Sequence, residues 1–523
     1  MDQRDMSDPL ESSQKMVPDL IKLDQIPDNF LQHVETDLLE TSTFQEATTT
    51  ASGYASFNLA QKGFLHSHSK ILVGLVPSAA GQMLPANIGI ASIIDRAVLK
   101  VRKSGQVIND ISDFGHFHAI KSCQISNETN REREQYMTGR IMNKEFKHYF
   151  DNGATTIYDA ERSLGYGLDN GREYSAKGGG GVRDVGQNGL AQPFSLMTTG
   201  APLESPTYSI DISDLFLFMK TQSLPLYMID QGLTLELYWS NTLSRVQRAG
   251  GASAGIAIDR NELKFVADYI TYTEDDAMNR YRDANPVIDM SFSDYRLSKN
   301  TRSQVEIQNG FVRQLGMNNR VVPRVITIIS NEVDGAGGPN AAVALDECLL
   351  GKYNMMAPVE NTGQTNVPGT LSYNIRYKSR FEFSQALTNK AQAFTQLVQS
   401  EGLPFVSRQE YSGDQEGYLA GRNAGGALVA GAEATFQGYV QGGKAAAGAG
   451  GRRIGALAGQ FFMLGTRLTN GRVGNDGVEL HLTALMPDES AAQNGSTPYI
   501  VRSYLEYVRR ARLENGEMEI MNA

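Results

Sequence analysis

The stretch that decides the fold is PTYSIDISDLFLFMKTQSLPLYMIDQGLTLELYWS, residues 206–240. Apolar and polar residues alternate from Tyr208 to Ser213, which is the period of a strand with one buried face. A compact apolar run follows, and a second alternating segment begins at Leu233 after a turn. We therefore expect a strand, an apolar plug and a return strand around one core. The plug comprises Leu215, Phe216, Leu217 and Phe218.

Length and composition indicate a large all-β protein. The 523 residues exceed one ordinary core and fit two large domains. The chain has 22 Tyr, 21 Phe and 52 Gly, which suits many strands joined by glycine-bearing loops. Cys123 and Cys348 lie far apart, so we expect no disulfide framework and a reducing compartment. No apolar run has the length of a membrane span, and we expect neither a span nor a signal peptide.

The negative charge is concentrated at the N-terminus. The net charge is -10, and residues 1–46 hold eleven acidic and three basic residues, a net of -8 that leaves -2 for the remainder. The nearly neutral remainder of the chain argues against a DNA-binding surface and favours association with copies of the same chain.

Residues 1–50 are expected to form an N-terminal arm. Its first 17 residues are polar and acidic, which is typical of a segment without a core. Apolar residues return from Val17 to Leu39, and residues 27–39 can form a short amphipathic helix with Pro27 near its start. Two interpretations remain open for this helix: it packs on its own domain, or it docks on a neighbouring subunit.

A first β domain is expected over residues 51–278. Strands are predicted over residues 55–59 and 69–76, then a short apolar helix, a hairpin turning at Gly105 and a helix over residues 113–121. Residues 145–189 form a long polar loop with four consecutive glycines. Residues 262–272 are the expected closing strand, and a charged helix from Asp275 links this domain to the next.

A second β domain is expected over residues 279–510. Strands are predicted over residues 292–296, 303–308 and 320–329, and again from Phe461, Val478 and Tyr499. A helix capped by Asn389 occupies the place that residues 113–121 occupy in the first half, which indicates one architecture used twice. Residues 415–460 form a Gly/Ala-rich insertion, and residues 511–523 are a tail able to pair with an exposed strand edge.

The order of segments in residues 206–240 resembles the closing half of the first jelly roll in double jelly-roll major capsid proteins of tailless icosahedral DNA viruses. The likeness is nearest to the virophage and polinton-like virus group. The loop ending at Gly89 with its short helix and hairpin, the helix that follows at residues 113–121, and residues 313–322 also resemble elements of that family. The resemblance implies an all-β fold of two tandem eight-stranded jelly rolls, with short helices in the loops, an N-terminal arm and a C-terminal tail.

The resemblance also implies a function and its partners. The chain is expected to be a structural protein of the virion shell, forming pseudo-hexameric homotrimeric capsomers without enzymatic activity or cofactor. Its partners would be other copies, neighbouring capsomers and minor capsid or penton proteins, with encapsidated DNA contacted only indirectly. The alternatives are a carbohydrate-binding or carbohydrate-cleaving β-sandwich and a receptor-binding spike or penton protein. The sandwich needs exposed aromatic residues or a carboxylate pair, whereas Trp239, the one tryptophan, lies on an alternating strand.

Few residues form patterns that indicate chemistry. Residues 438–444 match the start of a phosphate-binding loop, but Ala445 stands where that loop needs a hydroxyl, so we interpret the match as coincidence. Two His-x-His pairs could place both rings on one face of a strand and bind a metal, although core or interface histidines are the more common outcome. These candidates are His66, His68, His116 and His118. We expect no catalytic residue.

Overall fold

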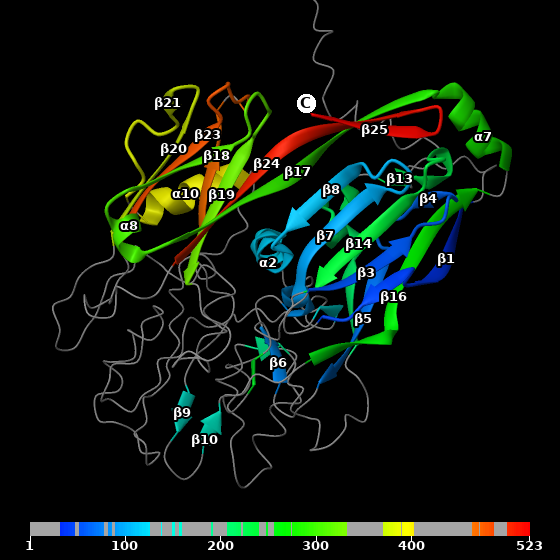
Figure 1. The fold of residues 1–523 in the computed structure, drawn as a ribbon, viewed down its shortest axis with the longest axis horizontal. Helices are drawn as coiled ribbons and strands as arrows, with labels where there is room; N and C mark the ends of the chain where they lie inside the picture. Colours follow the sequence, from blue (N-terminus) through cyan, green and yellow to red (C-terminus); the bar gives the residue numbers. More distant parts are fainter. Residues whose placement is uncertain are drawn as a thin grey trace, which may run out of the picture.

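The structure, a computed structural model, is built from antiparallel sheets with short helices between the strands (Figure 1). It describes residues 32–47, 52–77, 82–85, 89–125, 137–138, 149–151, 156–158, 190–191, 207–220, 223–239, 247–248, 256–272, 275–331, 370–388, 390–401, 463–469, 471–485 and 499–522. The Gly/Ala-rich insertion 415–460, which contains the phosphate-loop match, lies outside the described residues. Most of the loop 145–189 does so as well. No helix in the described ranges is long and apolar enough to cross a membrane.

Eight strands of the first half form two facing sheets. Numbered from one to eight along the chain, they pair in the order 1-8-3-6 in one sheet and 2-7-4-5 in the other. In chain order these strands are β1 (Gln32–Glu40), β3 (Gly53–Asn58), β5 (Lys70–Pro77), β7 (Ile94–Val101), β8 (Val107–Ser112), β12 (Thr207–Asp211), β14 (Leu233–Trp239) and β16 (Ile256–Tyr272).

Eight strands of the second half repeat the same two orders, 1-8-3-6 and 2-7-4-5. This pairing of eight antiparallel strands in two sheets is a jelly roll, so the expected pair of eight-stranded rolls is confirmed. The strands are β17 (Val287–Arg302), β18 (Phe311–Gly316), β19 (Arg324–Asn331), β20 (Thr370–Tyr377), β21 (Arg380–Phe381), β22 (Met463–Arg467), β23 (Val478–Leu485) and β24 (Tyr499–Glu514).

The helices repeat less strictly than the strands. In each half a twelve-residue helix follows the fifth strand, α2 (Phe114–Ile125) in the first and α10 (Lys390–Glu401) in the second. The expected correspondence of these helices along the chain is confirmed. Further elements are η2 (Gly89–Ile93), α7 (Asp275–Ala284), and the strands β2 (Thr43–Gln45), β4 (Phe64–Leu65), β6 (Gln82–Pro85), β9 (Tyr149–Asp151), β10 (Thr156–Tyr158), β11 (Leu190–Ala191), β13 (Leu224–Pro225) and β15 (Gln247–Arg248).

The stretch 206–240 places its two strands in opposite sheets of the first roll. Strand β12 pairs with β5, whereas β14 lies between β3 and β7. The plug between them is α6 (Ile212–Leu215) followed by η5 (Leu217–Lys220) and η6 (Leu226–Met228). Leu215 and Phe216 are fully buried, Phe218 is nearly so, and Leu217 is half-buried against the same core.

The helix expected over residues 27–39 is wrong from Gln32 onward, because this segment is strand β1. It pairs along its whole length with β16, where Val34 lies opposite Ile270 and Leu38 opposite Val266. Glu35 and Asp37 point to the other face of β1 and bind Lys62, so the alternation has a period of two rather than 3.6. Residues 43–45 also pair, as β2 with β3. We therefore propose that the first roll begins with β1 rather than at residue 51.

A second expected strand, at residues 303–308, is wrong. The segment is a short helix, α8 (Gln304–Gln308), which begins at a capping box. The Ser303 hydroxyl accepts a hydrogen bond from the backbone N–H of Glu306, and the Glu306 carboxylate accepts one from the backbone N–H of Ser303. Two N–H groups at the helix start are thereby satisfied, and this local gain outweighs the strand preference of the valine and isoleucine in the segment.

The C-terminal segment folds back as a hairpin. Strand β24 continues to Glu514, and β25 (Glu517–Asn522) pairs with its second half. Asn515 and Gly516 form the turn with φ values of +50° and +81°, the left-handed conformations that a two-residue hairpin turn requires. Of the residues 511–523 expected as a tail able to pair with a strand edge, residues 511–514 belong to β24 itself and residues 517–522 pair with it.

The plug leads to the first prediction. Replacing Phe216, which is fully buried, by alanine removes most of a large apolar side chain and leaves a cavity. We expect Phe216→Ala to lower the free energy of unfolding by about 3 to 5 kcal/mol, measured by urea denaturation. Val305→Ala on α8 is the control, since a change at this exposed side chain should cost less than about 0.5 kcal/mol. Equal stability of the two variants would contradict the assignment of Phe216 to the core.

Candidate functional site, the junction between the two rolls

The two rolls are joined by the strands β17 and β24, which run beyond the second roll and lie against the first (Figure 1). Strand β8, at the edge of its sheet, lies beside β17, and α2 packs between the rolls. The Phe117 ring of α2 contacts Tyr295 and Tyr504, with ring centroids 4.6 and 5.6 Å apart. The plug reaches the same junction, since the Phe218 ring lies 5.1 Å from Phe292 of β17. The junction is therefore an apolar layer with aromatic contacts.

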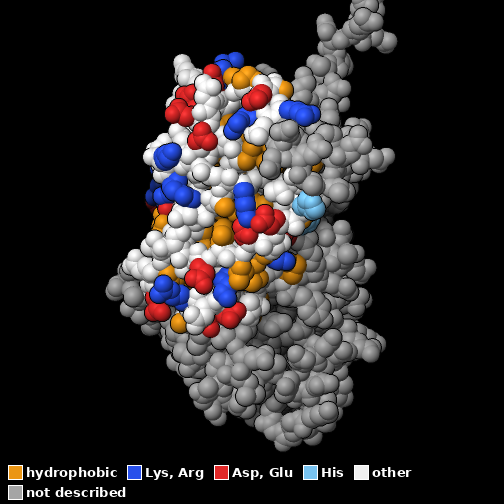
Figure 2. All heavy atoms as spheres, turned by 90° about the vertical axis from the view of Figure 1, so that its right-hand side faces the viewer, with side chains coloured by type: hydrophobic (Ala, Val, Ile, Leu, Met, Phe, Trp, Pro, Cys, Tyr) orange, Lys and Arg blue, Asp and Glu red, His pale blue; other side chains and the backbone are white. Residues whose placement is uncertain are grey.

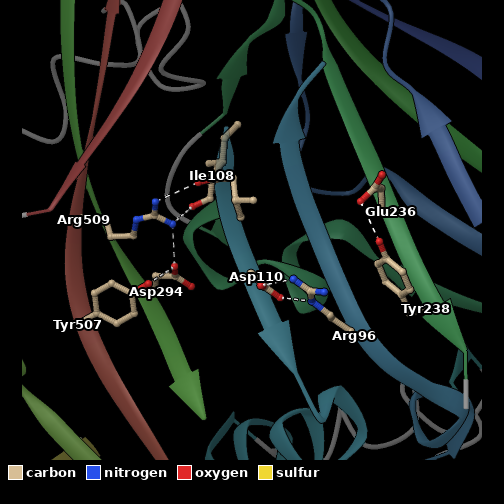
Figure 3. Close-up of polar contacts among 9 residues, drawn as sticks. Arg96, Ile108, Asp110, Glu236, Tyr238, Asp294, Tyr507 and Arg509 are labelled. Carbon is tan, nitrogen blue, oxygen red and sulfur yellow. Dashed lines mark hydrogen bonds and ion pairs between the residues drawn. The ribbon is translucent and has the colours of Figure 1, made fainter. Parts of the chain in front are cut away.

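Arg509 of β24 binds the exposed edge of the first roll (Figure 3). Its Nη1 and Nη2 donate to the backbone carbonyls of Ile108 and Val107 in β8, at 2.8 and 3.0 Å. An edge strand presents backbone groups that no neighbouring strand satisfies, and such edges invite pairing with other chains. The planar guanidinium satisfies two of these carbonyls together, which a lysine could not do in the same geometry.

Asp294 of β17 completes this contact from the second roll. Its Oδ2 accepts hydrogen bonds from Arg509 at 3.0 Å and from the Tyr507 hydroxyl at 2.7 Å, while its Oδ1 accepts one from the backbone N–H of Tyr295. Burial raises the pKa of Asp294 above its ordinary value, even though Tyr507 and Arg509 oppose that shift. The guanidinium thus lies between a carboxylate of one roll and a strand edge of the other.

A second polar contact is centred on Asp113, at the start of α2. Its backbone has a φ of +53°, a conformation that aspartate adopts more readily than most residues. Its carboxylate accepts from Arg502 Nε at 2.7 Å, lies 3.2 Å from the His116 ring and has Lys299 Nζ at 3.6 Å. Its carbonyl accepts from the Tyr504 hydroxyl. One residue of the first roll therefore contacts both long strands of the second.

The C-terminal hairpin makes a third contact with the first roll. The backbone N–H of Asp230 donates to the carbonyl of Gly516, and the N–H of Ile520 donates to Gln106 Oε1. A Cβ on Gly516 would overlap the Asp230 carboxylate. Glycine is therefore required here twice, for the turn and for the close approach of Asp230. The three contacts lie at separate points of the junction and together restrain rotation of one roll against the other.

A polar cluster lies around Glu236 of β14, and Figure 3 shows its contact with Tyr238. Glu236 accepts hydrogen bonds from the hydroxyls of Tyr54 at 2.7 Å and Tyr238 at 3.3 Å and pairs with Lys100. Burial alone would raise the pKa of Glu236, but Lys100 and the tyrosines hold it below its ordinary value of 4.5. Burial and the neighbouring carboxylate raise the pKa of Tyr54 to about 12. The cluster therefore links the neighbouring strands β3, β14 and β7 through their side chains, in addition to the backbone hydrogen bonds between them.

Several solved structures that resemble this chain are of virus capsids or their major capsid proteins. A chain of the PBCV-1 virus capsid is 12% identical, with a TM-score of 0.50, over 95% of this chain and 98% of its own length. The fold is the double jelly roll of viral capsid proteins. The Sputnik virophage structure (12% identity, 95% and 90% covered, TM-score 0.49) and the mavirus major capsid protein (10%, 95% and 91%, 0.48) are similar as well. No known family model and no curated protein matches the sequence.

The double jelly roll separates the residues that the sequence singled out for chemistry. His66 and His68 lie together with ring centroids 5.0 Å apart, and burial and the neighbouring His68 lower the pKa of His66. His116 and His118 are buried on α2, where His116 contacts Asp113. Within the described ranges, no group of three His, Cys, Asp or Glu residues could hold a metal ion. Trp239 is buried rather than exposed to a ligand.

Sequence reasoning missed the residues that join the rolls. Arg502 and Arg509 lie in a segment expected only to close the second domain, and Asp294 in one expected only to open it. No local pattern distinguishes these charges from those on a solvated strand face, because their partners lie about 215 to 400 positions away. The Asn515–Gly516 turn did carry a signal, since this dipeptide between two strand-like segments predicts a tight hairpin.

The Arg509 contact leads to a prediction about the junction. Arg509→Ala leaves the buried Asp294 carboxylate and two β8 carbonyls with fewer partners, so we expect a loss of about 3 to 5 kcal/mol in the free energy of unfolding. Arg509→Lys should restore only part of this loss, because an ammonium group cannot reproduce the fork. Arg512→Ala on the same strand is the control, since its pair with Glu514 is exposed and contributes about 0 to 1 kcal/mol. Urea denaturation measures all three, and equal effects of R509A and R512A would contradict this role.

The Glu236 cluster leads to a prediction about pH. Since the folded-state pKa of Glu236 is lowered, its charge stabilises the fold above the unfolded value of 4.5, and this contribution is lost as the pH falls through the folded value. We expect Glu236→Gln to be less stable than the natural chain at pH 7, by about 1 to 3 kcal/mol. This difference in stability between the two proteins should shrink below pH 4.5. Thermal unfolding measured at a series of pH values checks it. A difference that grows on acidification would contradict this assignment.

Proposed function

We propose that this chain is the major capsid protein of a tailless icosahedral DNA virus, a structural protein of the virion shell rather than an enzyme. The observation that carries the proposal is the repetition of one strand order, 1-8-3-6 and 2-7-4-5, in two rolls of a single chain. Two similar rolls fixed side by side make a building block with two near-equivalent units. Three such chains in a ring would present six units, which is a shape that tiles a closed shell.

The rigidity of the junction supports this role. A shell protein needs a fixed angle between its rolls, because an error in that angle is repeated in every copy. The Arg509, Asp113 and Gly516 contacts restrain this angle through buried hydrogen bonds and an apolar layer. A ligand-binding protein instead needs a pocket with exposed aromatic or paired carboxylate groups, and the single tryptophan of this chain is buried.

The proposal specifies the partners of the chain. Its main partner is a second and third copy, as a homotrimeric capsomer of pseudo-hexameric shape, followed by neighbouring capsomers and by minor capsid or penton proteins. Encapsidated DNA would be contacted only indirectly, which agrees with the near-neutral charge of the sequence after residue 46. The virophage and polinton-like viruses are the proposed group.

Purified protein tests this proposal directly. Sedimentation velocity at about 10 µM should give a trimer, since the subunit interfaces of obligate homo-oligomers are large and hydrophobic. Negative-stain microscopy should show hexagonal outlines, and raising the protein concentration should yield curved sheets or shells. A stable monomer that binds an oligosaccharide in a glycan array would overturn the capsid function and favour the sugar-binding or receptor-binding alternative.

A further inference from the structure

The turn of the C-terminal hairpin is an asparagine followed by a glycine, Asn515–Gly516. This dipeptide is prone to spontaneous deamidation, because glycine has no side chain to hinder attack of its backbone nitrogen on the asparagine amide. The sequence contains the dipeptide at seven positions, but the structure describes both residues at two of them, Asn309–Gly310 and Asn515–Gly516. These two sites can therefore be compared directly.

Deamidation is a reaction of the chain with water. The glycine nitrogen loses its proton to a base in the solvent and attacks Cγ of the asparagine, and a cyclic succinimide forms as ammonia leaves. Water then opens the ring at one of its two carbonyls. Opening at Cγ gives aspartate, whereas opening at the backbone carbonyl gives isoaspartate, in which the main chain runs through Cγ. The attack needs an accessible side-chain amide and a glycine N–H that is not held in a hydrogen bond.

The hairpin turn meets both requirements. Asn515 is exposed. In the part of the chain that the structure describes, neither the Gly516 N–H nor the Asn515 side chain makes a hydrogen bond. The last pair of the β24–β25 ladder is Glu514 and Glu517, so the backbone N–H groups within the turn lie outside the ladder. The turn reaches the side of the molecule on which α7 lies (Figure 1), and Figure 2 shows acidic, basic and hydrophobic side chains interspersed on that side.

The other site, Asn309–Gly310, is exposed as well, but its backbone is held. Asn309 is the C-cap of α8 and donates its N–H to the carbonyls of Val305 and Ile307. The Gly310 N–H donates to the carbonyl of Ile307 at 3.3 Å. Attack by the Gly310 nitrogen must first break this hydrogen bond, which should slow the reaction by about three- to tenfold.

We propose that Asn515 is a site of spontaneous deamidation in the folded chain, and that its conversion releases the C-terminal hairpin from the first roll. Gly516 lies against the Asp230 carboxylate, and its carbonyl accepts a hydrogen bond from the Asp230 N–H at 2.9 Å. Conversion to aspartate adds a carboxylate to a turn that already contains Glu514 and Glu517 and faces Asp230. Conversion to isoaspartate adds one carbon to the main chain and displaces the Gly516 carbonyl from its donor. Either product weakens this contact.

The release should be confined to the hairpin. The hydrogen bond from the Ile520 N–H to Gln106 belongs to β25 and depends on the same turn. The contacts of Arg509 and Asp113 do not include the turn. Conversion should therefore loosen β25 while the two rolls stay joined. This inference does not depend on the proposed capsid function, because it concerns the chemistry of one turn within the chain.

Peptide mapping by mass spectrometry tests the reaction. The full chain is incubated in mildly alkaline buffer, which favours loss of the amide proton, both folded and in urea. In urea the two sites should convert at similar rates. In the folded chain Asn515 should convert at nearly its rate in urea, and Asn309 about three- to tenfold more slowly than Asn515. An Asn515 that is protected by folding, or equal rates at the two sites in the folded chain, would overturn the proposal.

Hydrogen exchange measures the release. After incubation the natural chain, and Asn515→Asp without incubation, should exchange the amides of residues 517–522 about three- to tenfold faster than the fresh natural chain. Asn515→Gly is the matched control, since two glycines keep the turn while the reactive amide is gone, and its exchange should not change on incubation. The amides of β8 should exchange as before. Conversion of Asn515 without faster exchange at residues 517–522 would overturn the release, and the capsid function would stand.

Discussion

The hydrogen bonds from Arg509 to the β8 carbonyls are the contact on which the arrangement of the two rolls depends. Each jelly roll is a closed two-sheet core, but its sheets still have edges, and an edge strand pairs with whatever backbone approaches it. In this chain a guanidinium held by Asp294 occupies the β8 edge and ties it to the second roll. The unpaired backbone groups of this sheet edge thereby become part of the contact between the two rolls.

The junction combines two kinds of interaction, whose free energies depend on geometry to different degrees. The aromatic layer of Phe117, Tyr295 and Tyr504 contributes free energy with little directional preference. The buried pairs at Asp113 and Asp294 contribute less net free energy but tolerate few geometries, because a displaced partner leaves a buried charge without its hydrogen bonds. Apolar contact therefore holds the rolls together, and the polar contacts determine the angle between them. In the proposed shell role, that angle would be the functional property.

The repeat also explains why the two rolls differ at their surfaces. The first and eighth strands of the second roll are buried under the first roll, and the sequence there places Tyr504 and Arg502 on the covered face. The equivalent first strand of the first roll, β1, carries Val34 and Leu38, which are exposed. Two copies of one topology have thus acquired different side chains on equivalent faces, according to what each face contacts within the chain.

The sequence by itself determined the fold class and the order of the main elements, because strand alternation, turn residues and the plug 206–240 are local patterns that burial of one face enforces. It also placed α2 and α10 at equivalent positions of the two halves. Tertiary structure alone decided that Gln32–Glu40 is a strand, since its pairing with β16 outweighs an apolar pattern that also suits a helix. It alone revealed the junction as well. Arg509, Asp294 and Ile108 meet across hundreds of residues, and a charged side chain on a strand reads the same in sequence whether it faces water or another domain.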